Sequence, residues 1–200
     1  MATASLGSTY RAETLDALDG GIFDVIVIGG GITGVGGALD AASRGLSVAL
    51  IEQRDLSSGT SSRSSKLFHG GLRYQEQFDF KLVMEALHER ELIRQKLAPH
   101  LVWPVPFLYP LSHRVWERAY VGTGITFSEG LAAIGGNTLP RQWHLSRSEL
   151  QRVFPSIKKD AFVGGIRYYD AGCDDARYTI AVARTASELG ARILTSARVE

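Results

Sequence analysis

The sequence has 200 residues, enough for one complete domain or parts of two. Its apolar fraction of 44% is that of an ordinary globular protein, and its net charge of +1 gives no basic surface for nucleic acid. The only cysteine, Cys173, excludes an internal disulfide and fits a reducing compartment. There is no signal-peptide pattern and no apolar run of the roughly 20 residues that span a bilayer, so a cytoplasmic location is expected.

The N-terminal part of the chain predicts a βαβ unit. Residues 1–22 are polar and are expected to form a flexible tail, with a helical turn from Ala12 to Leu18. Four apolar residues, Val25 to Ile28, then suit a strand buried on both faces of a parallel sheet. A helical pattern follows and stops at Gly45, and a second strand, residues 47–51, leads into Glu52.

Glycines at 29, 31 and 34 connect the first strand to the helix with the spacing G-x-G-x-x-G. Gly29 makes the tight turn, Gly31 lets a pyrophosphate approach the backbone, and Gly34 lets the helix pack close to the sheet. The amides at the helix start then face the phosphates. Glu52 lies about 20 residues further on, where an acid accepts hydrogen bonds from a ribose. We predict a dinucleotide site; the alternative is a glycine-rich turn without a ligand.

Seven of the nine residues from Ser57 to Ser65 carry hydroxyl groups. This stretch is either a flexible linker or a polar loop that follows the phosphates and ring of a cofactor. Because it runs directly into KLFHGGLRY, which mixes apolar anchors, paired glycines and cations, we favour the cofactor loop. The cofactor contacts expected there are Ser61, Ser62, Ser64, Ser65, Leu67, His69, Gly70 and Gly71.

The middle of the chain predicts a helix followed by a proline-rich segment. Residues 79–97 have helical spacing, with Asp79 as the cap and a charged face expected in solvent. The members of this face are Glu85, Glu89, Arg90, Glu91 and Arg94. Three prolines in residues 101–111 predict an edge strand or an extended connection, where the chain crosses into a substrate-covering domain.

Residues 112–150 carry an aromatic and aliphatic series that allows two interpretations. The series forms either a core helix of the second domain or an amphipathic surface that docks on a membrane. Its glycines weaken a continuous helix, and residues 135–137 suggest a turn. Ser146 and Glu149 have the spacing of a capping box before a short helix.

The last part of the chain predicts a return to the first sheet. Residues 162–169 read as a strand, and Asp174 and Asp175 introduce a helix over 177–189. A third parallel strand is expected over 193–199, which leaves the sheet short. We therefore interpret the chain as the N-terminal piece of a longer protein.

Three segments resemble the FAD-dependent glycerol-3-phosphate dehydrogenases of aerobic bacteria and mitochondria. They read GGGITGVGGALDAASRGLSVALIEQRDLSSGTSSRSSKLFHGGLRY, HERELIRQKLAPHLVWPVPFLYPL and GGIRYYDAGCDDARYTIAVARTASELGARIL. The resemblance covers about residues 23–199. It implies a bound FAD with its ribose on Glu52, sn-glycerol 3-phosphate as substrate, dihydroxyacetone phosphate as product, and a quinone as final acceptor.

The resemblance implies a fold class and a division of the chain. The class is α/β, an incomplete Rossmann-like FAD-binding parallel sheet with part of a mixed α+β substrate domain. The expected regions are a tail (1–22), the first part of the FAD-binding domain (23–100), part of the substrate domain (101–170) and a return (171–200). The expected adenine-side contacts are Gly29, Gly31, Ile32, Thr33, Gly34, Glu52 and Gln53.

Arg73 is the best candidate for a substrate contact, because its fork of donors suits a phosphate or a polarised oxygen. A surface ion pair is the alternative, and Tyr74 either donates a hydrogen bond or packs in the core. His69 is expected along the flavin rather than as the general base. No cluster has metal-ligand spacing.

Other functions are kept open. The chain could belong to a related FAD oxidase that uses oxygen, a nicotinamide-dependent dehydrogenase or a non-catalytic nucleotide-binding remnant. Further substrate-binding cations are expected beyond residue 200, so the piece alone is expected to be inactive. Peripheral membrane contact and homo-oligomer formation are also left open.

Overall fold

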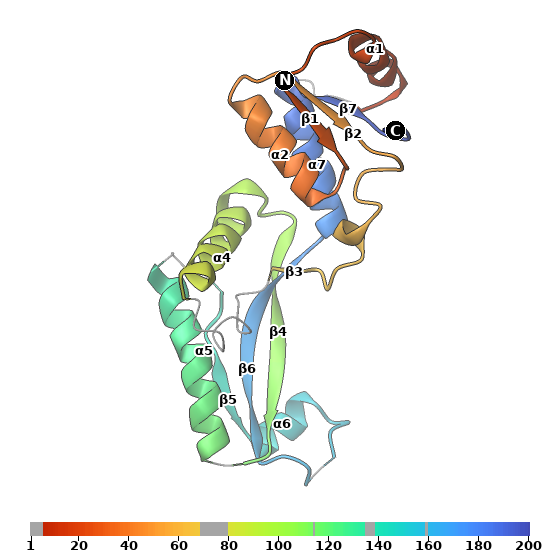
Figure 1. The fold of residues 1–200 in the computed structure, drawn as a ribbon. Helices are drawn as coiled ribbons and strands as arrows, with labels where there is room; N and C mark the ends of the chain where they lie inside the picture. The colour runs from red at the N-terminus through yellow and green to blue at the C-terminus, as the bar shows by residue number, and fades with distance from the viewer. Residues whose placement is uncertain (1–5, 69–79, 114, 135–138, 159) are drawn as a thin grey trace. The chain divides into compact units, whose positions relative to one another are not determined.

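The computed structural model describes all residues except 1–5, 69–79, 114, 135–138 and 159. It divides the chain into two compact units. Unit 1 combines residues 1–66 with 174–200, and unit 2 contains residues 67–173 (Figure 1).

Unit 1 is built on a parallel sheet of β1 (Val25–Ile28), β2 (Val48–Ile51) and β7 (Arg192–Leu194), in the order β1-β2-β7. Helix α2 (Ile32–Ser43) connects the first two strands, and α7 (Asp175–Glu188) precedes β7. The two helices lie side by side over the sheet (Figure 1). The predicted βαβ unit and the three parallel strands are therefore confirmed.

Small side chains form the contact between α2 and α7. Ala38 and Ala42 of α2 share a buried cluster with Ala183 and Ala186 of α7, and Leu50 of β2 lies in the same cluster. Alanines let two helices approach closely, because the separation of helix axes depends on the side chains at the contact. This packing holds α2, and the turn before it, firmly against the sheet.

Strand β1 differs from the prediction of burial on both faces. Val25 and Val27 pack against the core, but Ile26 and Ile28 are 61% and 71% exposed. Both α2 and α7 lie on one face of the sheet, and no described element covers the opposite face at β1. The alternating pattern is that of a half-covered sheet rather than of a fully buried strand.

Strand β7 is also shorter than the expected 193–199. Ser196 adopts a φ of 52°, and its backbone N–H donates to the Arg54 carbonyl at 2.7 Å. The N–H of Ala197 then donates to the carbonyl of Glu52 at 3.0 Å. The chain therefore leaves the strand after Leu194 and turns toward the loop that follows β2.

The N-terminal segment contains helix α1 (Ser8–Leu18), which is longer than the expected turn at Ala12–Leu18. The Tyr10 hydroxyl donates to the Ala191 carbonyl at 2.9 Å and accepts from the Ile193 N–H at 3.0 Å. Tyr10 thus makes the two hydrogen bonds that a neighbouring strand would make at the free edge of β7. The mobility expected for residues 1–22 stays a prediction.

Unit 2 is built on an antiparallel sheet with β6 (Gly164–Cys173) at its centre. Strand β4 (Val102–Leu111) pairs along the whole of β6, and β3 (Leu67–Phe68) and β5 (Trp143–Ser146) pair with its two ends. The proline-rich β4 is an edge strand, as its composition predicted.

Strand β6 extends four residues past the predicted end at 169. The reason is the close approach of β4, since a Cβ on Gly172 would lie 2.6 Å from Cγ2 of Val105 and 2.9 Å from Nε1 of Trp103. Glycine has low strand propensity, so the local sequence does not signal this continuation.

The predicted helix over 79–97 is α4 (Phe80–Leu92) followed by the π-helical turn η2 (Ile93–Leu97). Asp79, its expected cap, lies outside the described residues. Val83 and Leu87 are buried, as the apolar spacing predicted.

The charged face expected in solvent on α4 is wrong at two positions. Arg90 and Glu91 are only 5% and 2% exposed, and Arg90 Nη1 lies 3.0 Å from Oδ1 of Asp170 on β6. Glu91 also pairs with Arg94, with Nη2 and Oε2 3.2 Å apart. Asp170, on a strand distant in sequence, allows Arg90 to be buried, and Glu91 is buried beside Arg90, with its Oε1 3.4 Å from Arg90 Nη2.

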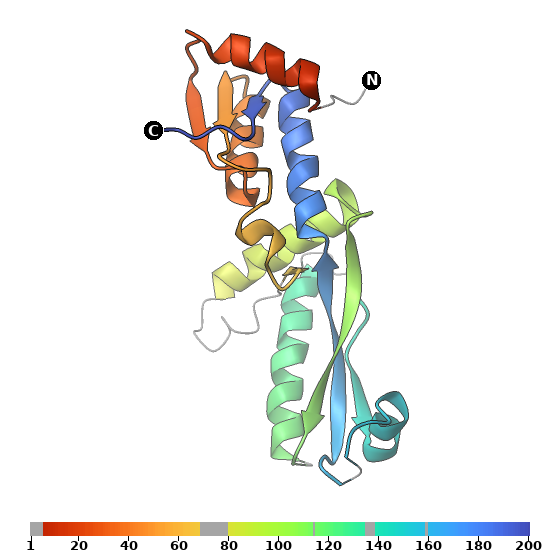
Figure 2. The same ribbon diagram turned by 90° about the vertical axis from the view of Figure 1, so that its right-hand side faces the viewer.

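Helix α5 (Trp116–Ile134) continues through Gly122, Gly124 and Gly130, although these glycines were expected to weaken it. Ile125 packs against Leu111 of β4 and Ile166 of β6, so its inner face belongs to the core of unit 2. This helix runs along the sheet (Figure 2). The turn expected at 135–137 lies outside the described residues.

Helix α6 (Arg147–Val153) starts with the predicted capping box. The Ser146 N–H donates to Oε2 of Glu149 at 2.8 Å, and the Glu149 N–H donates to Oγ of Ser146 at 3.3 Å. Asp174 caps α7 by accepting the Arg177 N–H at 3.1 Å, as expected for an acid at this position.

The chain enters unit 2 at residue 67, earlier than the expected crossing at 101, and returns at 174, close to the expected 171. Contacts of α4 explain the earlier crossing, because α4 packs on α5 and is joined to β6 through Arg90 and Asp170. The FAD-binding and substrate-covering roles of the two regions stay predictions.

Candidate functional site: a glycine turn between β1 and α2

The predicted glycine motif forms the connection from the end of β1 to the start of α2. Gly29 adopts a φ of 112°, which L side chains rarely adopt, and its N–H donates to the Ile51 carbonyl at 2.9 Å. A Cβ on Gly34 would lie only 2.0 Å from the carbonyl oxygen of Gly29. Only glycine at 34 therefore lets α2 start this close to the strand.

Gly31 is the N-cap residue of α2 and has more space than Gly34. The nearest atom to a Cβ at this position is Oγ of Ser61, at 3.3 Å. The first turn of α2 carries no acidic side chain. The positive end of the helix dipole is thus left without a charge from its own first turn, which suits an anionic ligand.

Glu52 points from the end of β2 toward this turn and is 9% exposed. Its Oε2 accepts the Gly30 N–H at 2.7 Å, and its Oε1 accepts the Arg54 N–H at 2.7 Å. Each carboxylate oxygen has two acceptor positions, so both keep one for a further donor such as a hydroxyl. The carboxylate is therefore fixed beside the turn in an orientation compatible with the predicted ribose contact.

The hydroxyl-rich loop reaches the same turn through Ser61. This residue lies in the short helix η1 (Thr60–Ser62), and its Oγ accepts the Ile32 N–H at 2.9 Å. Ser61 thus satisfies one of the free amides at the start of α2. The stretch is therefore joined to the start of α2, and its contact with a cofactor stays a prediction.

A cavity of about 550 Å³ lies where the turn, the first turns of α2 and η1 meet. The predicted contacts that line it are Gly29, Gly31, Ile32, Thr33, Gly34 and Ser61. Its size is within the usual range of ligand sites, and four of its ten lining residues are glycines. The bare glycines, the free helix start and the fixed carboxylate fit the adenosine diphosphate half of a dinucleotide.

Other predicted contacts lie elsewhere. Gln53 is exposed next to Glu52, and Ser62 donates to the Gly59 carbonyl at 3.3 Å. Ser64 donates to Asp175 at the start of α7, so the loop is joined to both α2 and α7. Leu67 belongs to β3 of unit 2, and Ser65 has no described role at the cavity. The remaining candidates, His69, Gly70, Gly71, Arg73 and Tyr74, lie outside the described residues.

Two residues that the sequence analysis did not identify contact the turn at Gly30. Ser57 adopts a φ of 61°, is buried, and donates its N–H to the Gly30 carbonyl at 2.9 Å. Leu56 packs so closely that a Cβ on Gly30 would lie 2.9 Å from its Cδ2. The only signal in the sequence was the Ser-Ser-Gly turn composition, which does not identify a partner.

Comparison with known proteins identifies the class to which this fold and turn belong. The model of the family described as FAD dependent oxidoreductase matches residues 24–200. The chain therefore belongs to this family, whose cofactor is FAD, and the predicted cofactor and fold class are confirmed.

The resemblance found in the sequence is confirmed by relatives named glycerol-3-phosphate dehydrogenase. The Mycobacterium leprae protein is 55% identical over 196 residues, which are 98% of this chain and 33% of that protein. The mitochondrial protein of Bos taurus is 44% identical over 188 residues, which are 90% of this chain and 25% of that protein. The chain thus spans about a third of the length of the mycobacterial relative.

Solved structures agree with the fold. The glycerol-3-phosphate dehydrogenase from Bacillus halodurans complexed with FAD has a TM-score of 0.66 and 29% identity, with 95% of this chain and 29% of that chain covered. The L-alpha-glycerophosphate oxidase from Mycoplasma pneumoniae with FAD bound has a TM-score of 0.63 and 17% identity, with 88% and 45% covered. The second likeness concerns the fold alone.

Proposed function

We propose that the protein oxidises sn-glycerol 3-phosphate to dihydroxyacetone phosphate in glycerol catabolism, with FAD as cofactor and a quinone as final acceptor. The observation that carries the proposal is the turn from Gly29 to Gly34, with Glu52 hydrogen-bonded to the Gly30 N–H. Family membership and the names of the most similar relatives support the substrate.

The geometry of the turn supports the adenine-side roles that we propose. The amides of Ile32, Thr33 and Gly34 would hold the pyrophosphate, and Ser61, whose Oγ accepts the Ile32 N–H, would donate its hydroxyl to a phosphate oxygen. Glu52 would accept a ribose hydroxyl with its remaining acceptor positions, and Gln53 lies beside it in the sequence. Ser62, Ser64, Ser65 and Leu67 are proposed as further cofactor contacts.

The flavin supplies the hydride acceptor when it is bound. His69, Gly70 and Gly71, which lie outside the described residues, would contact the flavin, because glycines permit close approach of the main chain. Arg73 would hold the phosphate or a polarised oxygen of the substrate, and Tyr74 would donate a hydrogen bond to it. Correct placement of the substrate can contribute roughly 7–11 kcal/mol to lowering the barrier. The general base and further cations belong to the part of the relatives that this chain does not span.

The proposal includes peripheral contact with the cytoplasmic face of a membrane, where a quinone is available. Trp116 and Tyr120 of α5 are 62% and 70% exposed, and aromatic side chains of this kind sit well at an interface between lipid and water. Among the described residues, none of the helices is long and apolar enough to cross a bilayer. Homo-oligomer formation stays a prediction.

The visible spectrum tests this proposal. The chain is expressed with and without a longer C-terminal extension, and flavin absorbance is recorded before and after glycerol 3-phosphate is added without oxygen. We expect a yellow extended form whose flavin absorbance bleaches with substrate. Arg73→Ala should keep the flavin and turn over more slowly. Absence of flavin from both forms would refute the proposal, and unchanged kinetics in Arg73→Ala would remove that residue from the site.

The electron acceptor is tested separately. Reduction of a soluble quinone by the extended form without peroxide supports the dehydrogenase. Peroxide formation in air at the same rate as substrate loss would assign the protein to the related oxidases instead.

A further inference from the structure

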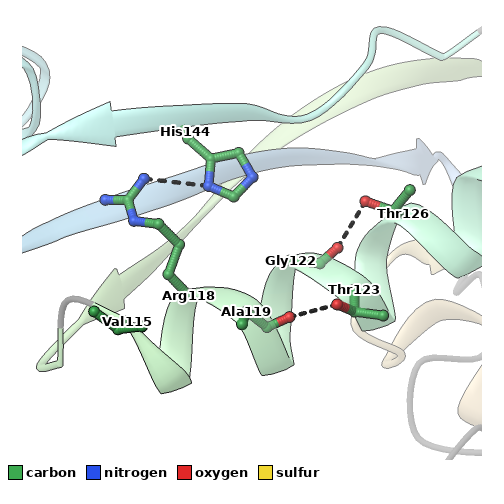
Figure 3. Close-up of a pocket in the computed structure, with 7 residues that line it drawn as sticks. All are labelled: Val115, Arg118, Ala119, Gly122, Thr123, Thr126 and His144. Atoms are coloured by element: carbon green, nitrogen blue, oxygen red, sulfur yellow. Dashed lines mark hydrogen bonds between the residues drawn. The ribbon is translucent and has the colours of Figure 1, made fainter.

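Unit 2 contains a second cavity, of about 700 Å³, between α5 and β5. Figure 3 shows the side chain of Arg118 leaving α5 and reaching the ring of His144 on β5. Val115, directly before α5, and Ala119 and Thr123 on the helix follow one another along the cavity. All of these residues belong to unit 2, so the cavity is independent of the glycine turn.

Arg118 is held in place by two acceptors that carry no negative charge. Its Nη1 lies 3.2 Å from Nδ1 of His144, and its Nη2 donates to the Leu145 carbonyl at 3.1 Å. Glu117, its neighbour on α5, instead accepts the backbone N–H groups of Ser112 and His113, each at 2.7 Å. In the described part of the chain, Arg118 forms no ion pair with a carboxylate. A guanidinium fixed in this way keeps donors free for a planar or tetrahedral oxyanion.

The contact with Arg118 also determines which nitrogen of His144 carries the proton. Arginine has donors only, so Nδ1 must accept, and the neutral ring then carries its proton on Nε2. Burial, and secondly the charge of Arg118, lower the pKa of His144 below its ordinary value. Near neutral pH the ring is thus a donor at Nε2, and both polar groups at this end of the cavity offer hydrogens.

Two glycines make room for this pair. A Cβ on Gly164 would lie 2.6 Å from Nη2 of Arg118, and a Cβ on Gly122 would lie 3.1 Å from Cε1 of His144. A side chain at either position would displace the guanidinium or the ring. The hydroxyl of Thr123 already donates to the Ala119 carbonyl at 2.6 Å, so it adds no donor of its own.

We infer that Arg118 and His144 form an oxyanion-binding site that takes the phosphate or sulfate group of a small molecule or of a lipid headgroup. Arg118 supplies the charge, Nε2 of His144 supplies a second donor, and the stripe from Val115 to Thr123 contacts the apolar part of the ligand. The site lies outside the residues assigned above to FAD and glycerol 3-phosphate.

Titration with sodium sulfate, followed by the NMR signal of the His144 ring, tests the site directly. Sulfate does not change its charge near neutral pH, so the signal reports on the protein. We expect a saturable shift in the full chain and its weakening by about tenfold or more in Arg118→Gln. The matched control is Arg152→Gln, which removes one exposed positive charge from α6 in the same unit and should bind sulfate unchanged.

A second variant keeps the charge and blocks the space. Ala119 is exposed on α5 and borders the cavity, so Ala119→Leu fills it without disturbing the helix. Loss of sulfate binding in both variants, each with an unchanged far-ultraviolet circular dichroism spectrum, supports the site. A shift that does not saturate, or equal affinity in Arg118→Gln and Arg152→Gln, overturns it.

The source of the anion is separated by the same variants. Inorganic phosphate represents a soluble ligand, and vesicles of phosphatidylcholine with phosphatidic acid represent a headgroup, with pure phosphatidylcholine vesicles as control. If one of the probes binds the parent protein and not Arg118→Gln, the site is supported and that probe identifies the source of the anion. Binding of neither probe overturns it. Because flavin content is not measured, failure here leaves the proposed dehydrogenase activity unaffected.

Discussion

Gly31 and Gly34 belong to one motif, but a side chain would meet different atoms at the two positions. A Cβ on Gly34 would meet the Gly29 carbonyl oxygen at 2.0 Å, which is a backbone atom that cannot move independently. A Cβ on Gly31 would meet the Ser61 hydroxyl at 3.3 Å, which can rotate away. Gly34 is therefore required by the fold, and we propose that Gly31 is required by the ligand.

This difference predicts opposite outcomes for two variants of the extended form. Gly34→Ala should lower the free energy of unfolding by about 1–3 kcal/mol, because the strand and helix must separate. Gly31→Val should leave the unfolding transition almost unchanged and abolish FAD binding, because its side chain occupies the place of the pyrophosphate. Thermal unfolding and flavin absorbance per mole of protein measure the two effects.

Gly36→Ala is the control for both variants, since a Cβ there has no atom within 4 Å and lies inside α2. It should raise stability by roughly 0.5–1 kcal/mol through helix propensity alone. Full flavin content in Gly31→Val would show that the turn does not hold the pyrophosphate.

Asp24 and Ser47 pair at the start of β1 and β2. Oδ2 of Asp24 accepts from Oγ of Ser47 at 2.6 Å and from its N–H at 2.8 Å. These bonds lower the pKa of Asp24 below its ordinary value near 3.8, the side-chain bond contributing most. A depressed carboxyl pKa stabilises the fold above the unfolded pKa, and this contribution disappears as the pH falls through the folded pKa.

Ser47→Ala should therefore raise the pKa of Asp24 toward its ordinary value. The stability difference from the parent protein should be present at pH 7 and should shrink as the pH falls below about 3.8. A carbon-13 NMR titration measures the pKa of Asp24, and urea unfolding at pH 7 and at a pH below about 3.8 measures the stability difference. Ser43→Ala is the control, because Ser43 donates to the backbone carbonyl of Asp40, and its effect should not vary with pH. An equal effect of Ser47→Ala at both pH values would contradict the linkage.

At the scale of elements, the sequence predicted those helices, strands and caps whose contacts join residues close together in the chain. The strand, glycine turn and helix from Val25 onward are neighbours in sequence, and so are the residues of the capping box at Ser146. The burial of Arg90 could not be predicted, because its partner Asp170 follows 80 residues later. The continuation of β6 through Gly172 could not be predicted for the same reason, because it depends on the approach of β4, which is distant in the sequence.

The ion pair between α4 and β6 predicts a large effect for one substitution and a small one for its control. Asp170→Ala should lower the free energy of unfolding by about 1–3 kcal/mol, because buried Arg90 loses this hydrogen-bonded partner and keeps only Glu91, whose Oε1 lies 3.4 Å from its Nη2. Asp40→Ala removes an ion pair whose members are 65% and 69% exposed, and its effect should be much smaller because solvent screens the two charges. Urea unfolding compares the two, and equal losses would show that the buried pair does not join α4 to the sheet.

At the scale of the whole molecule, membership of the FAD-dependent oxidoreductase family could be predicted from sequence. Its sequence signals, the glycine turn after β1 and the hydroxyl-rich loop after β2, are both local. The five candidates from His69 to Tyr74 lie outside the described residues, and the resemblance to glycerol-3-phosphate dehydrogenases supports the substrate side of the proposal. The exposure of Ile26 and Ile28 could not be predicted either, because a continuous apolar strand does not tell how many of its faces other elements cover.

The interleaving of the two units has a consequence for biosynthesis. Strands β1 and β2 leave the ribosome long before α7 and β7, because all of unit 2 is translated between them. Val35 and Ala38 of α2 therefore stay uncovered until Ala183 and Ala186 of α7 have been synthesised. During this time their apolar surface can bind chaperones or pack incorrectly. Unit 2, whose residues are contiguous, can complete its sheet first, and the sheet of unit 1 is completed only when α7 and β7 have left the ribosome.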